Sequence, residues 1–299
     1  MNGSSGSDTQ NDLKACALVL ARLARAEDLG SGDVTSVLLH DTDTGTYRLV
    51  ARQPGVFAGR AVAETVLGVY DERIELRWSV RDGAAIDCES GELASLSGAS
   101  RTILEAERVL LNFLQRLCGV ATLTSHYVEA VAGTATRIFD TRKTIPGWRV
   151  LDKYAVRCGG GRNHRMGLHD AILIKDNHLA GIPIPQLARR VFDMLNAAST
   201  LEPQPSFVEV EADSLAQFAE LLKVVGIDVV LLDNFSLEDL RHAVALRDDA
   251  NLKGKLELEA SGGITLETVR DVADTGVERI SVGQITHSAP ALDLALDHA

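Results

Sequence analysis

Residues 207–235, FVEVEADSLAQFAELLKVVGIDVVLLDNF, contain two short apolar runs separated by a helical pattern. The runs are Phe207–Val210 and Val229–Leu232, and apolar residues recur at helical spacing over Leu215–Val225. A strand, a helix and a second strand in this order predict two parallel strands joined by a helical crossover. This stretch decides the fold class, because the same alternation recurs through the second half of the chain.

The alternation continues on both sides of that stretch. Further apolar runs lie at Arg137–Phe139, Ala171–Ile174, Leu256–Ala260 and Ile280–Val282, and further helical patterns at Leu237–Leu246 and Leu266–Thr275. Repeated units of this kind predict an α/β fold with a parallel sheet, which is either a closed barrel or an open doubly wound sheet. Six clear strands do not demonstrate an eight-stranded barrel, and a segment of about 150 residues is short for one.

Polar residues follow almost every one of these runs at its carboxyl end. They are Asp140-Thr141-Arg142-Lys143, Lys175-Asp176-Asn177-His178, Glu211, Asp233-Asn234, Ser261-Gly262-Gly263 and Gly283. In a closed barrel all strand ends surround one mouth, where active sites lie, whereas an open sheet would spread them along a line. The pattern therefore favours a barrel with an active site at its mouth.

The first 130 residues have a different pattern. A helix is predicted over 13–28 and one or two helices over 101–131; short strands are predicted at Tyr47–Ala51, Gly55–Ala58, Ile74–Val80 and Glu92–Ser97, with a hairpin turn at Arg81-Asp82-Gly83. We therefore expect a disordered tail, native or left from cloning, over 1–12 and an α+β domain over 13–130. The barrel follows over 131–285, and a C-terminal segment over 286–299 packs back on the N-terminal domain.

Composition excludes several classes of protein. The 299 residues carry a formal net charge of −12, with 45% hydrophobic and 24% charged residues, which is typical of a globular protein and unfavourable for a general nucleic-acid or anionic-membrane binder. No uncharged 18-residue window predicts a membrane helix, and the polar start is not a secretory signal. The four cysteines lie far apart, which argues against a disulfide framework or structural zinc and favours a reducing cytoplasm.

Positive charge is concentrated in one segment. Between residues 137 and 175 there are only three acidic residues but nine basic ones: Arg137, Arg142, Lys143, Arg149, Lys153, Arg157, Arg162, Arg165 and Lys175. A basic cluster in an acidic protein indicates either a solvated face or a pocket for a small, highly charged anion. The neighbouring Pro146-Gly147 and Gly159-Gly160-Gly161 are typical of loops, and this favours the pocket.

Two of the strand-end motifs indicate ligand chemistry. Ser261-Gly262-Gly263 lies between a strand and a helix, where glycine backbone N–H groups can bind phosphate, although a plain turn has the same sequence. Glu211 and Asp233 could hold Mg²⁺ through water, bind ribose hydroxyls or form salt bridges to the basic cluster. Glu209 and Glu259 should lie one step deeper in their strands and are weaker candidates.

Other candidate sites receive less support from the residues alone. His164, His169 and His178 lack the spacing of a zinc motif, so His164 beside Arg165 is better interpreted as an anion contact. Neither a P-loop nor a dinucleotide-binding glycine motif is present. Arg108 belongs to a polar helical stripe that the residues alone indicate to be a solvated face.

The chain resembles the quinolinate phosphoribosyltransferase family from Glu27 to Leu294. The strongest stretch is DTRKTIPGWRVLDKYAVRCGGGRNHRMGLHDAILIKDNHL at 140–179, supported by EDLGSGDVTS, AERVLLNFLQRLCGVAT, VEVEADSL, LLDNF, EASGGI and SVGQITHSAPALDL. The resemblance implies an N-terminal α+β sandwich followed by an incomplete, seven-stranded α/β barrel, the type II phosphoribosyltransferase fold.

The same resemblance implies an activity. It is the Mg²⁺-dependent transfer of the phosphoribosyl group of 5-phosphoribosyl-1-pyrophosphate to quinolinate, giving nicotinate mononucleotide, pyrophosphate and CO₂ in de novo NAD biosynthesis. Two alternatives stay open, namely a related pyrophosphorylase that acts on another aromatic acid and a non-catalytic sensor of phosphorylated sugars.

The resemblance also assigns roles to individual residues. It implies substrate binding by Arg108, Arg142, Lys143, His164, Arg165, Lys175, Glu211, Asp233, Ser261, Gly262, Gly263 and Gly283. Lys143, Lys175, Glu211 and Asp233 are the expected catalytic residues, and Glu211 and Asp233 the expected metal contacts. Arg108 matches an arginine that reaches the active site of the neighbouring subunit, which implies a homodimer or larger assembly with shared active sites and replaces the solvated-face interpretation.

Overall fold

The computed structural model describes residues 5–40, 42–89 and 91–299, and the chain divides into two compact units. The first unit consists of residues 1–125, 143–160 and 285–299, and the second of residues 126–142 and 161–284. We expected 131–285 to form one domain, but the loop and helix within 143–160 group with the first unit. The two units are described separately below.

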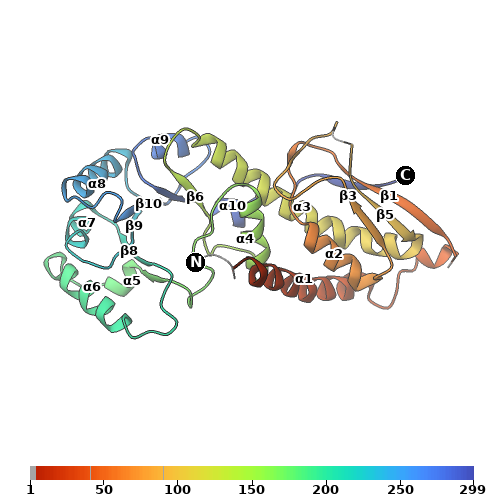
Figure 1. Cartoon of the computed structure of the whole chain (residues 1–299), viewed down its shortest axis with the longest axis horizontal. Helices are drawn as coiled ribbons and strands as arrows, with labels where there is room; N and C mark the ends of the chain where they lie inside the picture. Colours follow the sequence, from red (N-terminus) through yellow and green to blue (C-terminus); the bar gives the residue numbers. More distant parts are fainter. Residues whose placement is uncertain (1–4, 41, 90) are drawn as a thin grey trace. The chain divides into compact units, whose positions relative to one another are not determined.

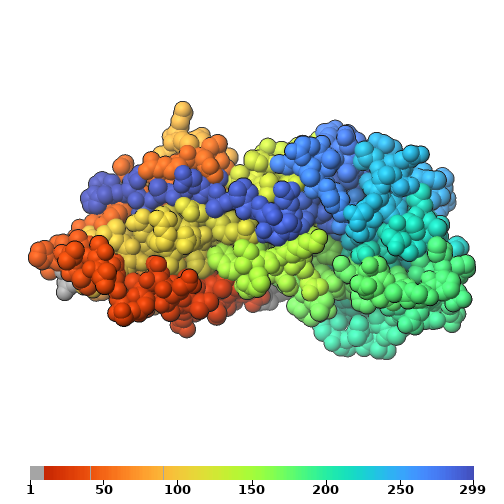
Figure 2. All heavy atoms as spheres, turned by 180° about the vertical axis from the view of Figure 1, so that it is seen from behind, coloured from red at the N-terminus to blue at the C-terminus, as the bar shows by residue number. Residues whose placement is uncertain are grey.

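The first unit is built on a four-stranded antiparallel sheet in the order β12-β1-β5-β3. Its strands are β1 (Thr44–Ala51), β3 (Glu75–Trp78), β5 (Glu92–Ala99) and β12 (Leu294–His298). Leu49 of β1 lies opposite Ala94 on one side and Leu296 on the other. The C-terminal strand thus completes the sheet of the N-terminal unit, and Figure 2 shows this blue segment on the surface beside the orange and yellow segments.

The same unit contains several helices. They are α1 (Ser5–Leu29), the single 3₁₀ turn η1 (Ser36–Leu38), α2 (Arg60–Tyr70), α3 (Ser100–Ala130) and α4 (Arg149–Cys158). The long helix α3 buries Ile103, Leu110, Leu114 and Leu117, an apolar stripe at helical spacing. Of the expected tail, residues 5–12 belong to α1, and residues 1–4 lie outside the described residues.

Two predictions for this unit are wrong. The helix α2 falls in a segment that was expected to contain only strands and turns, and its sequence RAVAETVLGVY is rich in valine, which favours strands locally. The Arg81-Asp82-Gly83 turn does not join a hairpin, because β3 pairs with β5, whereas β4 (Ala85–Ile86) pairs with β2 (Gly55–Val56). Non-local pairing decides both features.

The second unit contains six parallel strands in the order β6-β11-β10-β9-β8-β7. They are β6 (Arg137–Phe139), β7 (Ile172–Ile174), β8 (Val208–Ala212), β9 (Val229–Asp233), β10 (Glu257–Ser261) and β11 (Arg279–Ser281). Phe139 also forms an isolated parallel bridge with Arg162, which places a seventh extended segment beside β6. The predicted parallel strands are confirmed, and the arrangement is that of an incomplete barrel.

Helices α6 (Ile184–Ala198), α7 (Leu215–Leu221), α8 (Leu237–Asp249) and α9 (Val269–Ala273) lie outside the strands of this unit (Figure 1). Two short helices, α5 (Asp176–Leu179) and α10 (Gln284–His287), follow β7 and β11. The first four residues of β9 are all buried, as expected for a strand covered on both faces. Among the described residues, no helix is both long and apolar enough to cross a bilayer.

Candidate active site at the strand ends

Three predicted residues lie at the ends of successive strands. Lys175 follows β7, Glu211 is the next-to-last residue of β8, and Asp233 is the last residue of β9. The Nζ atom of Lys175 lies 3.8 Å from Oε2 of Glu211. Burial raises the pKa of the Glu211 carboxyl, the negative charges of Asp233 and Asp176 raise it further, and the positive charge of Lys175 opposes them. The structure therefore brings these three predicted residues together, with their charges acting on one another.

The glycine loop adjoins this acidic pair. Ser261 lies opposite Asp233 in the sheet, and the backbone N–H of Asn234 donates to the Ser261 carbonyl at 2.8 Å. The side-chain amide of Asn234 donates to Oδ2 of Asp233 at 2.7 Å. Gly262 has a φ of +101°, and a Cβ there would lie 2.1 Å from Oδ1 of Asn234. Glycine is therefore required for this close approach.

Gly283 is placed beside the same loop by the strand order. It follows β11, the parallel neighbour of β10, and residues 260 and 280 lie opposite each other. The predicted phosphate loops are therefore carried by adjacent strand ends, as the sequence pattern indicated.

Asp140 anchors the segment that carries His164 and Arg165. It follows β6, is fully buried, and accepts through Oδ1 from the backbone N–H of His164 at 2.9 Å. Its Oδ2 accepts from the side-chain amide of Asn163 at 2.6 Å, and its own N–H donates to the carbonyl of Arg162 at 3.1 Å. Sequence reasoning did not assign Asp140 a role, although it begins the DTRKT motif.

The guanidinium groups of Arg142 and Arg165 interact electrostatically. Burial lowers the pKa of Arg165, and the positive charge of Arg142 lowers it further. Nη1 of Arg165 donates to the carbonyl of Ala171 at 3.2 Å. The Nε atoms of both arginines are shielded from solvent and donate to no described protein atom. Paired guanidinium forks with unused donors are suited to carboxylates.

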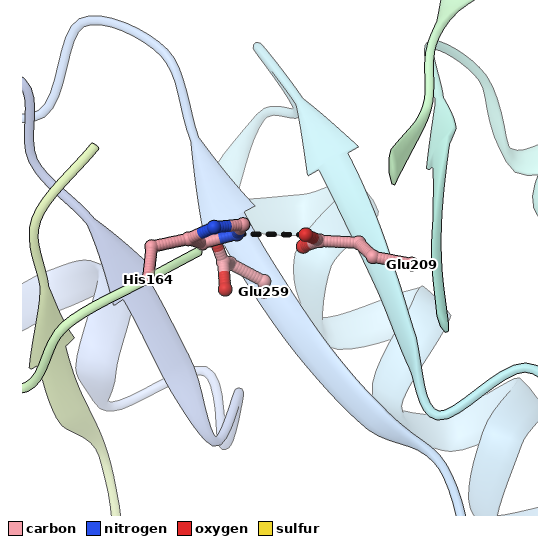
Figure 3. A group of neighbouring side chains, drawn as sticks. All are labelled: His164, Glu209 and Glu259. Carbon is pink, nitrogen blue, oxygen red and sulfur yellow. Dashed lines mark ion pairs between the residues drawn. The ribbon is translucent and has the colours of Figure 1, made fainter. Parts of the chain in front are cut away.

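A buried charged cluster lies deeper in the barrel. Nε2 of His164 lies 2.7 Å from Oε2 of Glu209 and 3.5 Å from Oε1 of Glu259. Figure 3 shows both carboxylates pointing towards the imidazole from β8 and β10. Nε of Arg279 lies 2.6 Å from Oε2 of Glu259. The prediction that Glu209 and Glu259 lie below the mouth is confirmed, because neither is exposed.

Burial of this cluster raises the pKa values of its two glutamates. Burial raises the pKa of Glu209 and of Glu259 to about 7, and the positive charge of Arg279 opposes the shift in both. Arg279 was missed by sequence reasoning. It begins β11 and lies opposite Glu259 in the sheet, and this pairing leaves no local signal in the sequence.

Two clusters of side chains in this unit have ligand atoms that could bind a metal ion. Those of His164, Glu209 and Glu259 lie within 4.8 Å of one another, but one carboxylate oxygen of Glu259 already contacts the Arg279 guanidinium at 2.6 Å. Glu211 and Asp233 instead lie at the partly exposed strand ends, and their carboxylate oxygens are the donors that Mg²⁺ prefers. The raised pKa of Glu211 beside other carboxylates also fits a site that gains from a divalent cation.

The remaining predicted residues, Arg108 and Lys143, belong to the first unit. Arg108 is exposed on α3, and Lys143 is exposed in the loop before α4, where its carbonyl accepts from the Thr286 hydroxyl at 2.8 Å. Lys153 is fully buried within α4, and the basic segment is divided between the two units.

The sequence is similar to known proteins along most of its length. It matches the profile described as "Quinolinate phosphoribosyl transferase, N-terminal domain" over residues 33–118 and that described as "Quinolinate phosphoribosyl transferase, C-terminal domain" over residues 120–297. The chain belongs to the quinolinate phosphoribosyltransferase family. The resemblance seen in the sequence is therefore confirmed along nearly the full chain.

Known members of the quinolinate phosphoribosyltransferase family align with this chain over most of their own length. The nicotinate-nucleotide pyrophosphorylase [carboxylating] of Mycobacterium leprae is 43% identical over 283 residues, covering 92% of this chain and 95% of the relative. A probable enzyme of the same name from Bacillus subtilis is 39% identical over 272 residues, covering 91% and 89%. The solved nicotinate-nucleotide pyrophosphorylase of Francisella tularensis superposes with a TM-score of 0.86 at 38% identity, covering 96% and 97%.

Proposed function

We propose that this chain transfers the phosphoribosyl group of 5-phosphoribosyl-1-pyrophosphate to the ring nitrogen of quinolinate, with loss of CO₂ and pyrophosphate. The product is nicotinate mononucleotide, a precursor in NAD biosynthesis. One observation carries the proposal. A pair of arginines with shielded, unused donors and a pair of strand-end carboxylates belong to the same barrel unit. The first suits an aromatic dicarboxylate and the second suits a ribose centre that becomes cationic.

The acceptor site is proposed around Arg142 and Arg165. Quinolinate is a planar dianion, and a guanidinium binds a carboxylate through two parallel hydrogen bonds. The free Nε–H groups of both arginines supply such donors without loss of an existing protein contact. In a homodimer or larger assembly with shared active sites, Arg108 of the neighbouring subunit supplies a third guanidinium.

The donor site is proposed around the glycine loops and the two lysines. Backbone N–H groups of Ser261, Gly262, Gly263 and Gly283 bind the 5′-phosphate, and Lys143 and Lys175 bind the pyrophosphate. Glu211 and Asp233 would hold Mg²⁺, and the bound cation would offset the charge of the leaving pyrophosphate. The lysines would bind the anionic pyrophosphate and the carboxylates would bind the cation, so both kinds of side chain are needed near the strand ends.

The chemistry follows from these charges. The bond from the anomeric carbon to pyrophosphate breaks as the bond to the ring nitrogen forms, and positive charge develops on the ribose. Glu211 and Asp233 stabilise that charge. The ring nitrogen is then cationic and stabilises the electron pair that remains on C2 when the bond to the 2-carboxylate breaks. The carboxylate leaves as CO₂, and a proton takes its place on C2. The arginines act by fixing the ring nitrogen towards the sugar.

One assay tests the proposal. The protein is incubated with quinolinate, 5-phosphoribosyl-1-pyrophosphate and Mg²⁺, and nicotinate mononucleotide, pyrophosphate and CO₂ are quantified. We expect the three products in equal amounts and none when quinolinate is omitted. Pyrophosphate release that requires a different aromatic acid would indicate a related pyrophosphorylase, and donor binding with no pyrophosphate release from any acceptor would indicate a sensor.

A further inference from the structure

We infer that Asp140 is a positioning residue for the acceptor site, because its carboxylate joins the two chain segments that carry Arg142 and Arg165. The inference rests on the proposed function, since it assigns the consequence to quinolinate binding. Asp140 is fully buried, so it acts through the groups that it holds and not by contact with the substrate.

The two segments are neighbours in the barrel unit and share a short stretch of backbone pairing. β6 pairs with the following extended segment through an isolated bridge at Arg162. The N–H of Arg162 donates to the Ile138 carbonyl at 2.8 Å, and the N–H of Asp140 donates to the Arg162 carbonyl at 3.1 Å. Arg142 lies two residues beyond Asp140, and Arg165 lies three residues beyond Arg162. Both guanidinium groups are therefore carried by chain that leaves this short pairing.

The Asp140 side chain extends the connection beyond these backbone bonds. Oδ1 accepts the backbone N–H of His164 at 2.9 Å, and Oδ2 accepts the side-chain amide of Asn163 at 2.6 Å. One carboxylate, at the residue that follows β6, thus binds two consecutive residues of the second segment. Because the main chain of His164 leads directly into Arg165, these bonds fix the points from which both side chains extend.

Burial makes these contacts difficult to replace. Asp140 has no exposed surface and His164 is only 9% exposed, so a backbone N–H that lost its acceptor there would have little access to water. A guanidinium binds a carboxylate through two parallel bonds only when it is placed accurately. A small displacement of this segment should therefore weaken quinolinate binding. The glycine loops follow other strands, β10 and β11, so donor binding should change much less.

Two variants at position 140 test the acceptor role of the carboxylate. Asp140→Leu is similar in size and has no acceptor, whereas Asp140→Asn keeps one oxygen that can accept the His164 N–H. We expect Asp140→Leu to raise the KM for quinolinate by about tenfold or more, with the KM for 5-phosphoribosyl-1-pyrophosphate within about threefold. The rise in Asp140→Asn should be smaller. Equal rises in the two KM values would indicate general damage and overturn the inference.

Exchange of the two bonded side chains gives a sharper test. Asn163→Asp places two carboxylates at the 2.6 Å contact and should raise the quinolinate KM by about tenfold. Asp140→Asn/Asn163→Asp again places an amide opposite a carboxylate, and its quinolinate KM should return to within about threefold of the wild-type value. A double variant that is no better than Asn163→Asp alone would overturn the inference.

A matched control is Asp228→Asn. Oδ2 of Asp228, just before β9, accepts the backbone N–H of Val208 at 2.7 Å at the start of β8. This carboxylate also binds the backbone of a neighbouring strand, but at the end of the strands opposite to the proposed site. The variant should leave both KM values unchanged. A quinolinate KM that rises as much in Asp228→Asn as in Asp140→Asn would contradict the assignment.

Hydrogen exchange covers the case in which Asp140→Leu does not fold. Exchange is followed by mass spectrometry on the wild type, Asp140→Asn and Asn163→Asp without substrate. The amides of residues 163–165 should exchange faster in both variants, by about threefold or more, and those of residues 261–264 at the wild-type rate. Unchanged exchange over residues 163–165 would overturn the inference. Because this measurement needs no substrate, failure of the wild-type chain to form nicotinate mononucleotide would count against the proposed function alone.

Discussion

A Cβ atom on Gly262 would lie 2.1 Å from Oδ1 of Asn234, whose amide donates to Asp233. The glycine loop after β10 and the carboxylate at the end of β9 are therefore in direct steric contact through one side chain. Any side chain at position 262 must displace Asn234 and, through it, disturb Asp233. This contact links the proposed phosphate loop to the proposed ribose-binding carboxylate.

The first prediction concerns this contact. Gly262→Ala should raise the KM for 5-phosphoribosyl-1-pyrophosphate by about tenfold or more, because it combines a steric clash with an unfavourable positive φ. Steady-state kinetics with the donor as the varied substrate measures the effect. Gly254→Ala is the matched control, since Gly254 also has a positive φ of +75° but nothing within 4 Å of its Cβ position. Equal donor KM values in the two variants would contradict the prediction.

The second prediction separates the two substrates. Arg142→Ala should weaken quinolinate binding by about 30-fold or more, as for the loss of a hydrogen-bonded charge pair, and change donor affinity much less. Arg162→Ala removes an exposed arginine of the same segment and serves as the control. A selective rise in the donor KM of Arg142→Ala would reject the assignment of this residue to the acceptor site.

The third prediction tests shared active sites. Arg108→Ala and Lys175→Ala should each be inactive alone, because one residue of every site is lost. After the two proteins are mixed and allowed to exchange subunits, activity should recover to about a quarter of wild type, since half of the dimers are hybrids with one intact site. Activity is measured against the mixing ratio, and no recovery despite demonstrated exchange would argue against a shared site.

The fourth prediction concerns the pH dependence of stability. Burial raises the pKa of Glu259 from 4.5 to about 7, so the folded chain retains this proton at a pH where the unfolded chain releases it. Stability therefore decreases as pH rises from about 5 to 7, by at most about 1.4 kcal/mol per pH unit for one proton. Glu259→Gln removes this contribution.

Urea unfolding at pH 5, 6 and 7 measures the difference between the two proteins. The advantage of the wild type over Glu259→Gln should be greatest at pH 5 and become smaller towards pH 7. His164, Glu209 and Arg279 surround this carboxyl and are present in both proteins, so their own titration enters both curves. Parallel pH profiles would show that Glu259 does not carry a raised pKa.

The sequence by itself determined the parallel barrel and the position of most strand-end residues. Local alternation of apolar runs and helical patterns is sufficient for this, because every βα unit repeats the same pattern and all strand ends face one side. Lys175, Glu211 and Asp233 could therefore be placed together from the sequence. The role of Arg108 came only from the family resemblance, since an exposed arginine on a polar helix stripe has no local signal of function.

Only the tertiary structure decided the contacts that depend on distant segments. The pairing of β12 with β1, the joining of β3 to β5 instead of β4, and the clamp of Glu209, Glu259 and Arg279 around His164 all connect residues far apart along the chain. A buried charge is tolerated only where partners converge on it, and such convergence leaves no periodic pattern in the sequence. For that reason the buried cluster of Glu209, Glu259 and Arg279 around His164 could not be predicted from the sequence.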